Sequence, residues 1–246
     1  MMEQYIFEFI GTLILVLFGD GVCAACSLNK SKAQGAGWVV IALGWGLAVM
    51  MGVLVAGPVS GAHLNPAVTL GLALAGSFPW ASVAGYVVAQ MLGGFVGAVL
   101  VWSFYKDHYK ATSEQPGVIL GTFCTMPAIR NLVRNFWCEV LATCMLVFII
   151  LALGFSGNAF QVGPVTASTG ALGSWPVTCL IMAIGMSLGG TTGYALNPAR
   201  DLSPRLAHAL LPIQGKGESG WWYSWVPVCG PLVGAALAAG LYLLVF

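Results

Sequence analysis

Two long stretches of this sequence carry no formal charge, one from Ala33 to Tyr105 and the other from Val140 to Ala199. A helix that crosses the hydrocarbon core of a bilayer needs about 20 mostly apolar residues, so each stretch is long enough for several crossings. Over the whole chain, 59% of the residues are hydrophobic and 7% are charged, whereas roughly a quarter are charged in an ordinary soluble domain. The sequence therefore predicts a membrane protein with several spanning helices.

Charge and motif content exclude several other classes of protein. The net charge is +1 without a block of like charges, so the basic patch that nucleic-acid binding requires is missing. The seven cysteines fall mostly in apolar runs, where cysteine behaves as a small hydrophobic residue. The three histidines lack metal-ligand spacing, and no Gly-x-Ser-x-Gly motif is present, so an intramembrane enzyme is not supported. We expect no enzyme activity, no cofactor, no metal site and no nucleic-acid partner.

Apolar length and the positions of Gly, Pro and charged residues predict six membrane-spanning helices. They fall near residues 5–27, 35–56, 82–105, 132–153, 176–194 and 222–246. Two shorter helical segments begin at the same tripeptide, Asn65-Pro66-Ala67 and Asn197-Pro198-Ala199. A helix over residues 65–77 would reach about 18 Å, which is roughly half of the ~30 Å hydrocarbon core. We therefore expect two re-entrant half-helices, each started by an asparagine cap and a proline in the first turn.

The two halves of the chain repeat each other. Glu8-Phe-Ile-Gly-Thr12 recurs as Glu139-Val-Leu-Ala-Thr143, and Asn65-Pro-Ala recurs as Asn197-Pro-Ala at nearly the same offset along the chain. Each half, about 1–125 and about 130–246, then holds three spans and one half-helix, and the odd number of spans inverts the second half in the membrane. Inverted repeats bring short broken helices face to face near the midplane. The expected fold is a single all-α transmembrane domain, residues 1–246, with six spanning helices and two half-helices.

Two half-helices that meet at the midplane predict the properties of a pore. Each N-terminus carries about half a positive charge, and the side-chain N–H groups of Asn65 and Asn197 add fixed donors. Such a site disfavours cations and interrupts the hydrogen-bonded water chain that would conduct protons. Asn-Pro is also a common helix start, but two copies at matching repeat positions favour a pore.

Irregular backbone is expected before each half-helix, over residues 57–64 and 189–196. Within a membrane such backbone is tolerated only inside protein or beside water. We expect its carbonyl groups to form one polar wall of the pore, opposite an apolar wall, which suits a small polyol. The expected lining residues are Gly61, Ala62, His63, Leu64, Gly193, Tyr194, Ala195 and Leu196. For His63 alone, a structural hydrogen bond is the competing interpretation.

Charged residues inside the spans are the remaining functional candidates, because intramembrane charges are costly. Glu8 and Glu139 occupy equivalent repeat positions, and we expect them to accept N–H bonds from the irregular loops; a proton relay is the alternative. Arg200 lies in the first turn of the second half-helix, where a cation gains nothing from the helix dipole. We expect it to face the pore, the alternative being an interfacial pair with Asp201. Asp201 and Arg205 are expected to be structural.

Together these motifs resemble the aquaporin family. The resemblance rests on both Asn-Pro-Ala motifs, the repeated Glu-x-x-x-Thr, and the segments from Ser60 to Thr69 and from Gly193 to Asp201. Asp201 directly after the arginine, and Trp45 well before Asn65, resemble the glycerol facilitators, or aquaglyceroporins. The resemblance implies a channel for glycerol and water, with urea and small protonated acids as further candidate solutes.

The family resemblance also implies a selectivity filter, formed here by Trp45, Gly185, Tyr194 and Arg200. A glycine at 185 leaves room for a carbon skeleton, where a water-only filter would place histidine. Tyr194 departs from the phenylalanine common in glycerol facilitators, and its hydroxyl would narrow or polarise the opening. His63 resembles the family's pore-lining histidine.

The resemblance further implies a homotetramer with one pore per subunit in a bacterial plasma membrane, with both termini cytoplasmic. In that topology every basic residue lies on an outer segment, the reverse of the positive-inside rule. These residues are Lys30, Lys32, Lys106, Lys110, Arg130, Arg134, Arg200, Arg205 and Lys216. The main rival to a channel is a proton-coupled secondary transporter that uses Glu8 or Glu139. An ion channel lacks the acidic ring that cations need.

Overall fold

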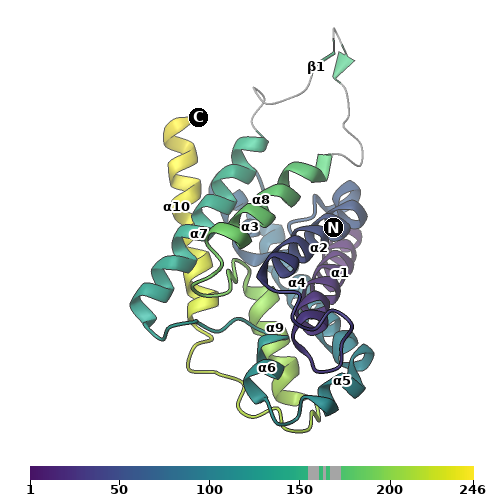
Figure 1. The fold of residues 1–246 in the computed structure, drawn as a ribbon. Helices are drawn as coiled ribbons and strands as arrows, with labels where there is room; N and C mark the ends of the chain where they lie inside the picture. The colour runs from purple at the N-terminus through teal and green to yellow at the C-terminus, as the bar shows by residue number, and fades with distance from the viewer. Residues whose placement is uncertain (155–160, 163–164, 167–172) are drawn as a thin grey trace.

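The computed structural model describes residues 1–154, 161–162, 165–166 and 173–246, and these form a bundle of helices with one small strand pair (Figure 1). Within this part of the chain, five helices are long and apolar enough to cross a bilayer: α1 (Met2–Ser27), α2 (Trp38–Ser60), α4 (Trp80–Phe104), α7 (Leu132–Leu153) and α10 (Val226–Val245). A sixth apolar helix, α8 (Trp175–Ser187), is shorter. The half-helices are α3 (Pro66–Leu74) and α9 (Pro198–Leu210).

The two halves of the molecule interlock through the half-helices. Helix α1 packs against α2 and α4, and α7 packs against α10, while α2 contacts α8 across the halves. Helix α9 of the second half packs against α4 of the first, and α3 of the first half packs against α10 of the second. Each half-helix is therefore held by a spanning helix from the opposite half.

Glycines bring these helices into backbone contact. A side chain at Gly97 on α4 would meet the Leu13 carbonyl of α1, and one at Gly94 would meet the Ala199 carbonyl of α9. On α10, a side chain at Gly234 would meet the Val140 carbonyl of α7. Small residues let membrane helices approach closely, because dispersion contacts rather than the hydrophobic effect join helices in lipid.

Several predicted helix ends differ from the structure by three residues or more, among them the starts of α1, at Met2 rather than 5, and of α10, at Val226 rather than 222. Helix α2 begins at Trp38 rather than 35 and continues through Pro58 to Ser60, so residues 57–60 are helical instead of irregular. It ends where Gly61 adopts a left-handed φ of 80°, which is the usual glycine stop signal. Helix α8 ends at Ser187 rather than 194, and the chain turns at Gly193 with a φ of 83°.

The first half-helix is also shorter than predicted, ending at Leu74 instead of Ser77. Gly76 has a φ of 73°, its N–H bonds the Ala73 carbonyl, and the Ser77 N–H bonds the Leu72 carbonyl. This pair of bonds is a Schellman motif, in which a left-handed glycine closes a helix.

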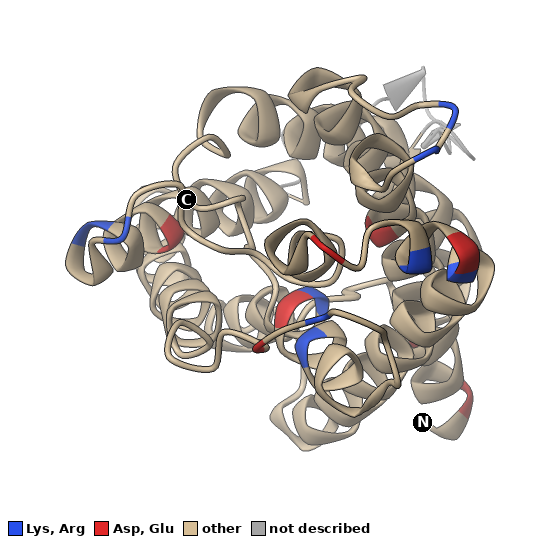
Figure 2. Ribbon diagram, turned by 60° about the horizontal axis from the view of Figure 1, so that its bottom comes forward, with Lys and Arg blue, Asp and Glu red and all other residues tan. Residues whose placement is uncertain are grey.

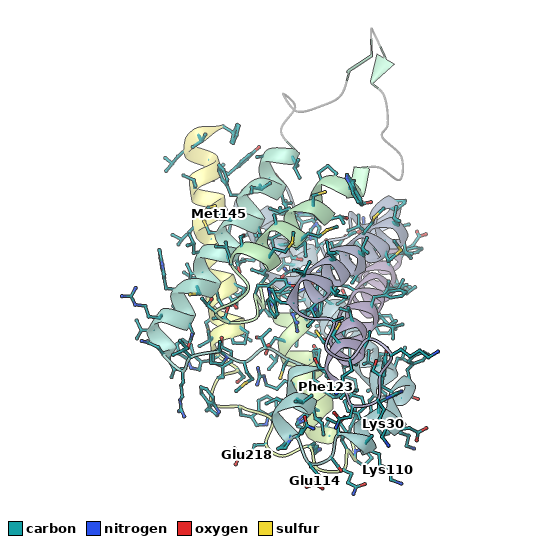
Figure 3. All side chains as sticks on the ribbon, in the orientation of Figure 1. Lys30, Lys110, Glu114, Phe123, Met145 and Glu218 are labelled. Atoms are coloured by element: carbon teal, nitrogen blue, oxygen red, sulfur yellow. The ribbon has the colours of Figure 1, made fainter. Side chains whose placement is uncertain are left out.

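Four elements were not predicted. Helices α5 (Lys106–Ala111) and α6 (Pro116–Gly121) lie in the connection between α4 and α7, and strands β1 (Gln161–Val162) and β2 (Val165–Thr166) pair antiparallel. They are too short to give a periodic signal. The connection with α5 and α6 lies at one end of the molecule, and the chain termini lie away from that end (Figure 1). Figure 3 labels Lys30, Lys110, Glu114 and Glu218 at the same end as α5 and α6.

Candidate functional site

The two half-helices meet through their first asparagines, which lie on loops from opposite halves of the chain. Asn65 Oδ1 accepts the Ala67 N–H at 2.8 Å and Asn197 Oδ1 accepts the Ala199 N–H at 2.9 Å, so each caps its own helix. Asn65 Nδ2 donates to the Leu196 carbonyl at 2.9 Å, and Asn197 Nδ2 donates to the Leu64 carbonyl at 2.8 Å. An amide nitrogen has two N–H donors, so each asparagine keeps one for another acceptor.

The loops before the asparagines share an unusual backbone. Ala62 and Leu64 have φ values of 51° and 52°, and their counterparts in the second repeat, Tyr194 and Leu196, have 40° and 57°. Such conformations cost about 1–3 kcal/mol each in residues other than glycine. The repeat thus extends from sequence motifs to individual backbone angles, and the surrounding contacts must hold both loops in place.

A buried carboxylate supplies those contacts for the first loop. Glu8 Oε1 accepts the His63 N–H at 2.9 Å and the Ser60 hydroxyl at 2.7 Å, while Oε2 accepts the Leu64 N–H at 2.8 Å and Gln90 Nε2 at 2.7 Å. The Glu8 side chain is fully buried. An ionised carboxylate is an acceptor with about four lone-pair sites. The four donors around Glu8 therefore satisfy its hydrogen-bonding capacity.

Glu139 does the same work for the second loop. Its Oε1 accepts the Ala195 N–H and its Oε2 accepts the Leu196 N–H, each at 3.0 Å, and it too is fully buried. Among the described residues, those that line the cavity below do not include Glu8 or Glu139. The carboxylates therefore support the loops from behind.

A cavity of about 170 Å³ runs beside these loops. One wall is polar and consists of loop backbone with the two asparagines and an arginine: Gly61, Ala62, His63, Leu64, Asn65, Ala195, Leu196, Asn197 and Arg200. The apolar wall comes from α1, α2, α3, α7 and α8: Leu15, Val49, Val53, Val68, Leu72, Leu146, Ile150, Val177 and Ile181. A solute inside therefore meets both hydrogen-bonding groups and hydrocarbon.

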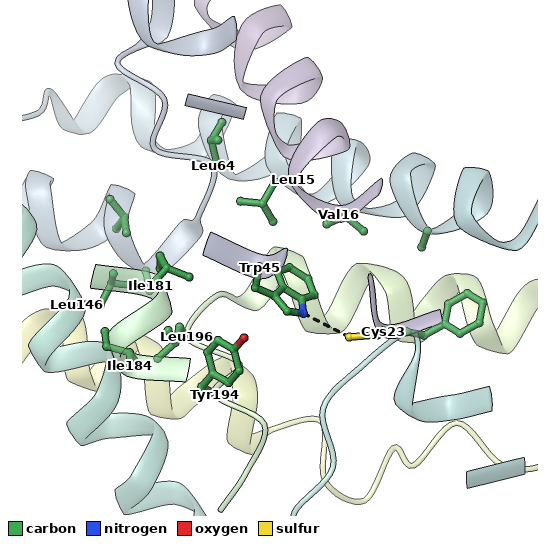
Figure 4. Close-up of a cluster of buried hydrophobic side chains, with 14 of the residues drawn as sticks. Leu15, Val16, Cys23, Trp45, Leu64, Leu146, Ile181, Ile184, Tyr194 and Leu196 are labelled. Atoms are coloured by element: carbon green, nitrogen blue, oxygen red, sulfur yellow. Dashed lines mark hydrogen bonds between the residues drawn. The ribbon is translucent and has the colours of Figure 1, made fainter. Parts of the chain in front are cut away.

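Aromatic rings and Arg200 lie together at one part of the cavity. Trp45, Tyr194 and Arg200 all line it, and the Arg200 Cζ lies 4.0 Å from the centroid of the Trp45 ring, a cation–π contact. Figure 4 shows Tyr194 facing Trp45, whose Nε1 donates to Cys23 Sγ at 3.3 Å. The Trp45 ring is thereby fixed by a contact outside the cavity.

Gly185 has a different position from the other three predicted filter residues. It does not line the cavity within the described chain, and a Cβ there would lie 2.9 Å from Tyr194 Cζ. Its carbonyl accepts Trp38 Nε1 at 2.8 Å. Gly185 makes room for the tyrosine ring, so its small size acts on the cavity through Tyr194.

Of the predicted lining residues Gly193 and His63, only His63 lines the cavity. Gly193 is outside the described lining and packs against Thr125. His63 lines the cavity, yet its Nδ1 lies 3.1 Å from Thr69 Oγ1 and its ring contacts Phe78 and Tyr86. The histidine thus has a structural contact on one side and the cavity on the other.

Asp201 and Arg205 form a buried cluster away from the cavity. Asp201 Oδ1 accepts Arg205 Nη2 at 2.8 Å, and Asp201 Oδ2 accepts the Thr125 N–H at 2.7 Å. Arg205 also donates to the carbonyls of Ser219 and Gly220. Both residues are fully buried, and they tie α9 to the loops that flank it.

The sequence predicted an apolar wall but not the residues that form it. Its residues fall in pairs four apart on α2, α3, α7 and α8, namely Val49 and Val53, Val68 and Leu72, Leu146 and Ile150, and Val177 and Ile181. Residues four apart share one helix face. In helices that are apolar on every face, nothing in the sequence distinguishes this stripe from the sides that face lipid.

The chain matches known proteins along nearly its whole length. A family model described as "Major intrinsic protein" matches residues 1–242. The chain is 56% identical over 239 residues to glycerol uptake facilitator protein 3 of Lactiplantibacillus plantarum, covering 97% of this chain and 95% of the relative. It is 52% identical to the glycerol uptake facilitator protein of Streptococcus pneumoniae, covering 97% of each.

A solved structure gives an independent comparison. The aquaglyceroporin from Plasmodium falciparum superposes with a TM-score of 0.83 at 31% sequence identity, covering 98% of this chain and 95% of that one. The likeness therefore extends over both halves of the fold described above.

Proposed function

The chain belongs to the major intrinsic protein family, and from this we propose that it is a passive channel for glycerol, water and other small uncharged solutes. The observation that carries the proposal is the mixed lining of the cavity, which combines loop backbone, two asparagines and Arg200 with aliphatic side chains. Glycerol has hydroxyl groups along one edge and C–H groups along the other. It fits such a cavity without chemistry, so no cofactor is needed and the protein is a channel rather than an enzyme.

Loop carbonyls and asparagine N–H groups replace the water that a hydroxylated solute loses on entry. The N–H groups of His63, Leu64, Ala195 and Leu196 turn toward the two carboxylates. This leaves the loop carbonyls as acceptors on the cavity side. Trp45, Tyr194 and Arg200 form the narrow filter, with Gly185 setting the position of the tyrosine.

Ions and protons are excluded where the two half-helices meet. Both half-helix N-termini direct positive dipole ends at the midplane, which disfavours cations. The asparagines donate to water there, so a water molecule cannot keep a continuous hydrogen-bonded chain through the pore. No observation in the described part of the structure favours the proton-coupled transporter, because Glu8 and Glu139 lie behind the loops.

We propose one channel domain of two inverted repeats, about 1–125 and about 130–246, that spans a bacterial plasma membrane several times. Its exposed apolar side chains, among them Val88, Leu92 and Trp137, suit contact with lipid or with neighbouring subunits. The proposed assembly is a homotetramer, with both termini in the cytoplasm.

The experiment compares two substitutions on one helix. Val53 lines the cavity, whereas Val55 is 42% exposed on the outer surface of α2; two residues along an α-helix are about 200° apart. Val53→Trp fills the cavity and Val55→Trp does not. Shrinkage of proteoliposomes after an osmotic jump, followed by light scattering, reports water and glycerol flux, and a pH-sensitive dye reports protons.

We expect fast glycerol flux without proton leak in the wild type and in Val55→Trp, and flux at the level of empty vesicles in Val53→Trp. Equal glycerol flux in the two variants would place the pathway elsewhere. Flux that requires a pH gradient would instead support the transporter.

A further inference from the structure

Asp20 is a buried acid near the end of α1 that the proposed pore mechanism does not use. Its side chain is 1% exposed, and within the described residues neither carboxylate oxygen has a hydrogen-bond partner. A carboxylate in a membrane-spanning helix is costly unless it is paired. Its nearest opposite charge is Arg200, whose Nη1 lies 3.9 Å from Asp20 Oδ1.

The guanidinium of Arg200 needs this partner as much as the acid does. Its Nη1 is buried and has no hydrogen-bond acceptor in the described part of the chain. One face of the guanidinium lies over the Trp45 ring, and the side chain lines the cavity. Arg200 is therefore held between an aromatic ring and a carboxylate at the edge of the cavity.

No other acid on the described chain takes this role. Asp201 follows Arg200 in sequence, but its oxygens bind Arg205 and Thr125. When Glu8 is aligned with Glu139, the position in the second repeat that corresponds to Asp20 is Leu151. The acid is therefore present in the first repeat and absent from the matching position of the second, so the internal symmetry of the fold does not explain it.

We propose that Asp20 is the counter-charge of Arg200, a positioning residue that makes the filter select uncharged solutes against anions as well as cations. An unpaired arginine repels cations but attracts anions. The carboxylate behind it cancels the net charge and leaves the cavity-facing donors free for solute hydroxyls. This inference rests on the proposed function, since it concerns solute choice at the same filter.

The test removes the charge and keeps the shape. In Asp20→Asn proteoliposomes we expect chloride and nitrate flux about tenfold above wild type, the change that corresponds to about 1.4 kcal/mol. Asp107→Asn is the matched control, because Asp107 is an exposed acid on α5, and its anion flux should equal that of the wild type. Asp20→Glu, which keeps the charge, should also exclude anions.

Each outcome decides the proposal. Anion flux at the wild-type level in Asp20→Asn vesicles that still pass glycerol would overturn it, and so would a leak in Asp20→Glu equal to that of Asp20→Asn, because the effect would then be steric. In the Arg200→Ala background, Asp20→Asn should no longer raise anion flux. If the asparagine variant does not insert, Asp20→Ser carries the same comparison. Absent glycerol flux in the wild type would count against the proposed function, whereas the anion ratio reports on the charge pair.

Discussion

One buried carboxylate supports each of the two irregular loops of this channel. The Ala195 and Leu196 N–H groups each have a Glu139 oxygen as acceptor, and both lie in a loop with left-handed residues other than glycine. A strained backbone persists only where its surroundings over-determine it. Loss of one acceptor should therefore destabilise the protein although the cavity lining is untouched.

Glu139→Gln tests this expectation. The glutamine amide offers one oxygen and one NH₂ group, so one of the two backbone N–H groups faces a donor instead of an acceptor. A buried donor without a partner costs about 1–3 kcal/mol, and we expect a lower midpoint of thermal unfolding in detergent. Glu3→Gln makes the same change at an exposed position and should leave the midpoint unchanged. An equal midpoint for both variants would contradict the supporting role.

The role of a residue could be predicted where its side chain requires one kind of partner. A carboxylate inside an apolar span needs donors, so partners for Glu8 and Glu139 could be sought in the nearby loops. The cross-repeat bonds of Asn65 and Asn197 could not be foreseen, because an asparagine that caps a helix gives no sign of where its amide nitrogen points. Nor does the sequence reveal that Asp20, in the first span, faces Arg200 in the second half-helix.

Glycines determine how closely neighbouring helices pack in this molecule. Gly234 and Gly240 both lie on α10. A Cβ at Gly234 would meet the Val140 carbonyl, and Cys144 N and Thr143 Cβ would lie at 3.0 Å, whereas a Cβ at Gly240 meets nothing within 4 Å. Alanine at Gly234 therefore tests close helix packing, whereas alanine at Gly240 tests helix propensity alone.

Gly234→Ala should lower the unfolding midpoint, because the added methyl group forces α7 and α10 apart, and overpacking costs about 1–3 kcal/mol. Gly240→Ala should raise the midpoint slightly, since alanine is favoured over glycine by about 1 kcal/mol in helix interiors. Both are measured in the same detergent by circular dichroism. If the two variants shift in the same direction, helix propensity rather than contact between α7 and α10 determines the result.

Element types were predictable and some element ends were not. Leu132–Leu153 was predicted at both ends, and it begins after the Asn131 cap and ends before Gly154. Helices α2 and α8 run into the Gly-rich loops, where several glycines and Pro58 offer alternative stops. The hydrogen bonds of the loops with Glu8 and Glu139 decide among them, and these are tertiary contacts that local sequence does not encode.

The distribution of charge concerns the whole molecule. Figure 2 shows few charged residues on the ribbon, and the labelled Lys30 and Lys110 lie at the end with α5 and α6, away from the chain termini. We propose that this end faces the outside of the cell. The orientation opposes the usual bias of basic residues toward the cytoplasm, so it needs a direct test.

A membrane-impermeant amine reagent applied to intact cells provides that test. Lys30, Lys32, Lys106 and Lys110 are exposed, and we expect labelling before permeabilisation. Lys216 should react less, because its Nζ donates to the carbonyls of His208, Ala209 and Leu211. Labelling of these lysines only after the membrane is opened would reverse the proposed orientation.

The reciprocal bonds of the two asparagines also have a consequence for biosynthesis. Asn65 donates to the carbonyl of Leu196, which lies in the other half of the chain, so a ribosome releases the donor long before it makes the acceptor. Until α9 enters the membrane, an incompletely synthesised chain holds an unmatched amide at the bilayer midplane. Premature termination between the repeats should accordingly yield a product that membrane proteases recognise and degrade. The first half alone lacks the Leu196 carbonyl that accepts the Asn65 amide.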